Sequence, residues 1–176
     1  MQRKFKKWSP ENVLKGRAAE TLVNEILRQA GWRVYRFGYE AVLQNLTQIE
    51  ENALRGDSDI VRQIRSIPDF LAVKSNKPVF IEVKFKARVR ENLDSNISED
   101  HDLLSQLERI NKFWKAKVIF VTPQEPYFRI SYPPYCENDK LHLLPLDTDN
   151  ELGVTPEILK DFNALVEKYF IKSNQG

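Results

Sequence analysis

Two acidic residues and a lysine in the segment PDFLAVKSNKPVFIEVKF, residues 68–85, have types and spacing suited to metal-assisted chemistry. Asp69 follows a proline, and Glu82 and Lys84 interrupt an otherwise apolar run. Two neighbouring carboxylates repel each other, and burial adds to the cost unless a cation lies between them. Oxygen ligands on rigid strands, with positions left for water and phosphate, suit Mg²⁺ in phosphoryl chemistry. We therefore expect a Mg²⁺ site here, at which Mn²⁺ can substitute.

The elements that must position these side chains are two strands, at residues 69–73 and 78–85, joined by a turn-like KSNK. This arrangement predicts an antiparallel hairpin. Side chains alternate along a strand, so one face of the second strand is apolar and belongs in the core: Val79, Ile81, Val83 and Phe85. Glu82 and Lys84 then project from the opposite face, where the hairpin brings Asp69 close to them.

Hydrophobic periodicity indicates the other elements. Helices are expected at residues 15–30, 103–114 and 156–171, strands at 32–37 and 117–123, and further candidate strands at 127–132 and 141–146. A charged segment without periodicity, residues 87–102, is expected to be a loop. A helix between residues 78–85 and 117–123 predicts that these two strands are parallel neighbours. The result is an α/β fold with a mixed central sheet flanked by helices.

The 176 residues predict a single domain, 1–176, because a chain of this length can bury one core. Its core spans about residues 15–122, with a helical insertion after the first strand at about 39–67 and a C-terminal extension at 123–176. The single cysteine excludes an internal disulfide framework, and no apolar run is long enough to cross a membrane. We expect a cytoplasmic protein without a membrane partner.

The charge of the chain is unevenly distributed. Residues 1–90 hold 18 Lys and Arg against 10 Asp and Glu, and the remainder holds 9 against 15, so the halves carry +8 and −6. A basic half suits a polyanion such as nucleic acid. Charge alone favours the simpler explanation, an uneven solvated surface.

The motif Pro68-Asp69, twelve residues, then Glu82-Val83-Lys84 resembles the signature of the PD-(D/E)XK nuclease superfamily, the restriction-endonuclease-like fold. The preceding KGRAAETLVNEILRQAGWRVYR is similar to the first helix and strand of archaeal Holliday junction resolvase-like nucleases, and places Glu20 where that family has a further site glutamate. The resemblance covers about residues 15–122. The 39–67 insertion and the acidic extension have no counterpart in the compact resolvases, which leaves the branched, duplex or single-stranded nature of the substrate open.

The resemblance implies a Mg²⁺-dependent endonuclease, a hydrolase of phosphodiester bonds in nucleic acid, with DNA favoured. Asp69, Glu82 and the backbone carbonyl of Val83 would hold the metal, and Glu20 would orient water or support a second ion. Lys84 would deprotonate the attacking water or stabilise charge on the phosphate. Such nucleases often act as homodimers, so a homodimer is compatible with this interpretation.

Other candidates have equally good structural explanations. Gln106 matches a glutamine that some relatives place near the site, or is a surface residue. Lys86, Arg88 and Arg90 could bind the phosphate backbone, or end a solvated strand. The alternative function is a catalytically inactive nucleic-acid-binding or assembly module that retains the fold.

Overall fold

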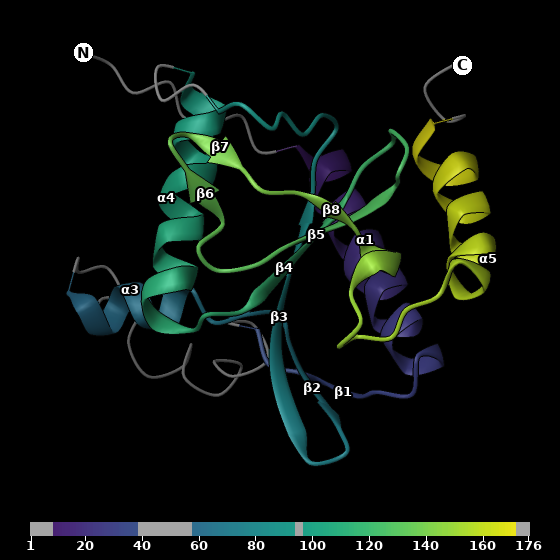
Figure 1. Ribbon diagram of the computed structural model, residues 1–176. Coiled ribbons are helices and arrows are strands. Elements are labelled where there is room, and N and C mark those ends of the chain that lie inside the picture. The colour runs from purple at the N-terminus through teal and green to yellow at the C-terminus, as the bar shows by residue number, and fades with distance from the viewer. Residues whose placement is uncertain (1–8, 39–57, 94–96, 172–176) are drawn as a thin grey trace.

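The computed structural model describes residues 9–38, 58–93 and 97–171, and a mixed six-stranded sheet lies at its centre (Figure 1). In spatial order its strands are β1 (Arg33–Arg36), β2 (Phe70–Lys74), β3 (Lys77–Phe85), β4 (Lys117–Val121), β5 (Phe128–Ser131) and β8 (Leu144–Pro145). Only β3 and β4 are parallel among these pairs, as their connection through a helix predicts. The expected α/β fold with a mixed sheet is confirmed at this level.

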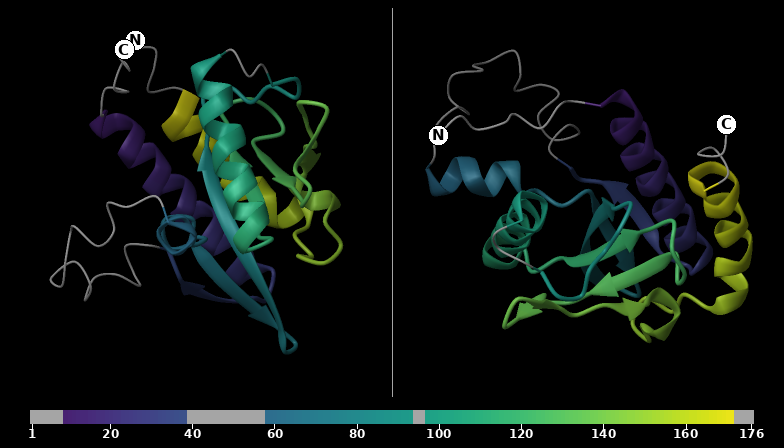
Figure 2. Two further views of the ribbon diagram at one scale, coloured as in Figure 1. Left: turned by 90° about the vertical axis from the view of Figure 1, so that its left-hand side faces the viewer. Right: turned by 90° about the horizontal axis from the view of Figure 1, so that it is seen from above.

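Helices cover both faces of the sheet (Figure 2). On one face lie α1 (Pro10–Gln29) and α5 (Pro156–Val166), the latter continued by a π-helical turn (Glu167–Ile171). On the other face lie α4 (Ser98–Phe113) and the small ribbon of β6 (Cys136–Glu137) and β7 (Lys140–Leu141). The short α3 (Asp59–Arg65) lies beside α4, and a 3₁₀ turn (Leu146–Thr148) follows β8. Each face therefore has its own apolar core.

The predicted alternation along β3 is confirmed. Ile81 and Val83 are buried in the core beneath α1 and α5, and Val79 and Phe85 pack against it. Phe80 points to the other face, where its ring lies 5.4 Å from both Phe37 and Trp114. Glu82 and Lys84 share that second face by register.

The predicted hairpin between β2 and β3 is also confirmed. Lys74 pairs with Lys77, so the turn contains only Ser75 and Asn76, whose φ angles are 50° and 62°. A two-residue turn with two positive φ angles matches the right-handed twist of the flanking strands, and asparagine tolerates this conformation better than most residues. The turn fixes the register, and the register places Asp69 opposite Glu82.

Several elements differ from the expectation. The candidate strand at 141–146 is divided between β7 of the small ribbon and β8 of the main sheet. The first helix begins at Pro10 rather than residue 15, because proline at the first helical position lacks an N–H that would otherwise be unsatisfied. Residues 98–102, expected in a loop, form the first turn of α4. Glu99 and Asp100 are favourable there because carboxylates interact well with the positive end of a helix.

The expected insertion at 39–67 is only partly described, whereas most of the C-terminal extension at 123–176 is described. From the expected insertion at 39–67, residues 39–57 lie outside the described residues, and α3 follows them. The C-terminal extension supplies β5 and β8 to the main sheet and α5 to one of its faces. In the described ranges, every helix is too short or too polar to span a bilayer.

Candidate active site

The candidate site forms where β3 continues past the end of β2. Phe70, the first residue of β2, pairs with Ile81. The rest of β3, residues 82–85, pairs with β4 on one side and extends beyond β2 on the other. The side chain of Asp69 replaces a backbone partner here, because its Oδ2 accepts a hydrogen bond from the backbone N–H of Val83 at 2.7 Å. In an extended strand the N–H and C=O of one residue point to the same edge, so the Val83 carbonyl also faces this opening.

Asp69 is held in an unusual electrostatic environment. Burial, reinforced by the neighbouring carboxylates of Glu82 and Glu20, raises the pKa of Asp69 to about 8, although the Val83 hydrogen bond and Lys84 act in the opposite direction. Glu82 is itself only 8% exposed. The fold therefore forces acidic groups together in a site that favours a proton or a cation between them.

Lys84 is the cation already present beside these carboxylates. Its Nζ lies 2.6 Å from Oε1 of Glu82, and both side chains are largely buried. Burial lowers the pKa of Lys84, but the charge and hydrogen bond of Glu82, with the charge of Asp69, outweigh it and leave the pKa raised. The side chain is thus a fixed ammonium group.

Glu20 reaches the same opening from α1. It lines a cleft of about 670 Å³ together with Asp69 and Glu82, and its Oε2 lies 3.5 Å from NH1 of Arg36 at the end of β1. The margin of the apolar face of α1 permits this position, since Ala19 and Val23 on either side are buried while Glu20 is half-buried. The three predicted acidic residues therefore converge on one cleft.

The other predicted residues lie outside this cleft wall. Gln106 is half-buried on α4, which covers the face of β3 that carries Glu82 and Lys84. Lys86, Arg88 and Arg90 follow the end of β3, where NH1 of Arg90 lies 3.9 Å from Oδ2 of Asp100. Within the described residues, none of these four lines the cleft.

Sequence reasoning missed three basic residues that do line the cleft: Arg17, Arg36 and Arg65. They lie on α1, at the end of β1 and in the last turn of α3. No motif or spacing links them in the sequence, so only the folded chain brings them together.

The donor set suits Mg²⁺ in its chemistry. Asp69, Glu82 and the Val83 carbonyl offer hard oxygen atoms, and Mg²⁺ commonly uses one or two carboxylates and completes its shell with water and phosphate. Across ranges 9–38, 58–93 and 97–171, no three His, Cys, Asp or Glu side chains are gathered closely enough to enclose a metal on their own. Glu20 lies toward Arg36, so Asp69 and Glu82 are the two carboxylates that could hold a metal together with the Val83 carbonyl.

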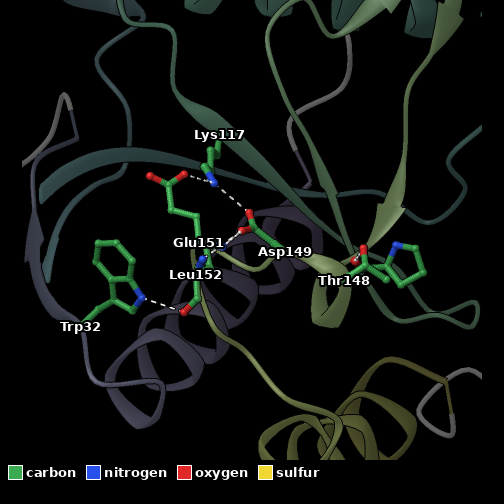
Figure 3. A network of polar contacts seen from close by, with 7 residues as sticks. Trp32, Lys117, Thr148, Asp149, Glu151 and Leu152 are labelled. Atoms are coloured by element: carbon green, nitrogen blue, oxygen red, sulfur yellow. Dashed lines mark hydrogen bonds and ion pairs between the residues drawn. The ribbon is translucent and has the colours of Figure 1, made fainter.

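Figure 3 shows a second buried acid–lysine cluster, around Lys117. Lys117 pairs with Ile81, so it lies one step along the sheet from Glu82 and on the opposite face. Nζ of Lys117 lies 2.8 Å from Oδ2 of Asp149 and 2.5 Å from Oε2 of Glu151. Oδ1 of Asp149 accepts hydrogen bonds from the backbone N–H groups of Glu151 and Leu152. The Leu152 carbonyl in turn accepts from Nε1 of Trp32 at 2.8 Å, which ties the loop before α5 to the end of α1.

No family model matches the chain, and no curated protein matches it.

Proposed function

We propose that the protein is a Mg²⁺-dependent endonuclease-like phosphodiesterase with the restriction-endonuclease-like fold, acting on nucleic acid, with DNA as the favoured substrate. The observation that carries this proposal is the convergence of Asp69, Glu82 and Lys84 beside an open cleft. Strongly perturbed ionisable groups in a cleft are typical of functional sites.

Asp69, Glu82 and the Val83 carbonyl would hold the metal. When bound, Mg²⁺ would supply Lewis acidity toward a phosphate oxygen and lower the pKa of a water molecule. Glu20, which lines the same cleft, would orient water.

Lys84 has the role of a charge stabiliser in this proposal. Its ammonium group is fixed by Glu82 and so needs little reorganisation when negative charge develops on a phosphate. Of the two roles that the sequence left open for this lysine, the ion pair favours stabilisation over deprotonation of water.

Cleavage of a substrate panel tests the function directly. Duplex, single-stranded and branched DNA and an RNA of the same sequence are incubated with the protein in Mg²⁺ or Mn²⁺. We expect cleavage of at least one substrate that is lost on chelation. Absence of cleavage across the panel would instead favour the inactive binding or assembly module.

Metal binding supplies a second readout that does not depend on the substrate. Calorimetric titration of Mn²⁺ should show binding that Asp69→Ala and Glu82→Ala each abolish. Asp161→Ala is a matched control, because Asp161 is exposed on α5 and lies outside the cleft wall. Unchanged Mn²⁺ binding in both site variants would refute the assignment of the ligands.

A further inference from the structure

Three arginines line the cleft, and we call them together the arginine wall: Arg17, Arg36 and Arg65. They come from three different elements, and all three are exposed. They share the cleft with Glu20, Asp69 and Glu82. The three arginines balance these three carboxylates in number.

The contact between Arg36 and Glu20 leaves the arginine able to exchange partners. The two groups are 3.5 Å apart, and the Arg36 side chain is 66% exposed. The solvent-exposed guanidinium group of Arg36 can therefore be reached by an incoming anion that replaces Glu20.

The chemistry of the wall selects phosphate as its ligand. The guanidinium group is planar and always charged, and its paired donors match two phosphate oxygens. Apart from the arginines and the three acidic residues, the described lining of the cleft is small or aliphatic, namely Val13, Gly16, Gly38 and Ile67, with no aromatic ring on which a base could stack. A cleft of about 670 Å³ lies within the size range of small-ligand sites and so suits a short stretch of backbone.

We propose that the arginine wall binds backbone phosphates of the nucleic acid next to Asp69 and Glu82, largely independently of base sequence. This inference rests on the proposed function and extends it by assigning the substrate contact to Arg17, Arg36 and Arg65. It differs from the sequence-based prediction, which assigned that contact to Lys86, Arg88 and Arg90.

Binding to a fluorescently labelled DNA duplex tests the wall without requiring cleavage. Anisotropy is measured in Ca²⁺ over a range of salt concentrations for the parent and for R36Q/R65Q. The control R33Q/R62Q changes the same charge on the same two elements, β1 and α3, at residues outside the cleft wall. Circular dichroism checks that each variant is folded, and R65Q alone serves if the double variant is not.

We expect R36Q/R65Q to bind at least tenfold more weakly and to lower the slope of log affinity against log salt by about two units, one per lost phosphate contact. R33Q/R62Q should bind like the parent, and a second duplex of different sequence should bind equally well. Three outcomes would each refute phosphate binding by the arginine wall. They are equal binding by R36Q/R65Q and the parent, an equal loss of binding in R33Q/R62Q, and no binding of DNA by the parent.

Together with the cleavage panel, this binding experiment distinguishes failure of the arginine wall from failure of the proposed function. A parent protein that binds DNA through the wall but cuts no substrate in Mg²⁺ would refute the enzyme and support the wall. A parent that cuts DNA while R36Q/R65Q binds normally would refute the wall and support the enzyme.

Discussion

The two buried acid–lysine clusters use the same residue types at adjacent positions of the sheet. Ile81 pairs with Lys117, so Glu82 and Lys117 lie one register step apart and leave opposite faces. Burial would raise the pKa of Asp149, but hydrogen bonds from Lys117, the Leu152 N–H and Tyr132 outweigh it and leave the pKa lowered. Asp69 accepts one backbone hydrogen bond and faces two other carboxylates, and its pKa is raised to about 8.

The difference shows how context separates a structural cluster from a candidate reactive one. The Asp149 carboxylate has partners for both oxygens within the chain, so it stabilises the loop that it joins. The Asp69 carboxylate lies in a cleft among like charges, so a ligand from outside can improve its environment. Stability should therefore depend on the first cluster, and metal binding and cleavage on the second.

The largest expected effect is on stability, at Asp149. Asp149→Ala removes the buried acidic partner of Lys117, leaves the exposed Glu151, and removes the acceptor for two backbone N–H groups. We expect the free energy of unfolding, measured with urea, to fall by about 3 to 5 kcal/mol.

Glu151→Gln is the matched control for Asp149→Ala. It removes the other acidic partner of Lys117, but the Glu151 side chain is 51% exposed, so the expected loss is below about 1 kcal/mol. Equal losses in the two variants would contradict a cluster centred on Asp149.

The next effect is on cleavage, at Lys84. Lys84→Met retains the length of the side chain and removes the ammonium group beside Glu82. Single-turnover cleavage should fall about a hundredfold, equivalent to about 2.7 kcal/mol of transition-state stabilisation.

Lys117→Met is the comparison for Lys84→Met on the opposite face of the sheet. Because Lys117 contacts Asp149 and Glu151 rather than the cleft, its loss should lower stability more than cleavage by the folded fraction. A parent that cuts and a Lys84→Met variant that cuts at the same rate would exclude the proposed role of Lys84.

The last effect concerns the dependence of stability on pH, at Asp69. Its folded pKa of about 8 exceeds the unfolded value, so the folded state holds an extra proton between these values and loses stability as pH rises through this window. The groups facing it are Glu82, Glu20 and Lys84. Asp69→Asn stays neutral, so its stability should not show this decline between about pH 4 and pH 8.

Asp149 should change the free energy of unfolding with pH in the opposite direction. Its lowered folded pKa contributes stability that is present above the unfolded pKa and is lost as pH falls through the folded pKa. Urea unfolding across the pH range, in the absence of divalent metal, measures both dependences. A parent and an Asp69→Asn variant with parallel profiles would show that Asp69 ionises normally.

The residues of the hairpin illustrate what could be predicted locally. Alternation of apolar and charged residues along β3 fixes its faces, and the short turn fixes the register, so the proximity of Asp69, Glu82 and Lys84 follows from the segment itself. The start of α4 was less predictable, because Ser98, Glu99 and Asp100 read as a loop by periodicity and as a helix start by charge.

The sequence by itself determined the mixed α/β architecture, the hairpin and the acid–lysine motif, because strand and helix periods act over a few neighbouring residues. Tertiary structure alone decided that Arg17, Arg36 and Arg65 share a cleft with that motif, and that Lys117 meets Asp149 across 32 residues of chain. It also decided the charge states of the two clusters. Ionisation depends on burial and on every charge within a few ångströms, and those neighbours come from distant parts of the chain.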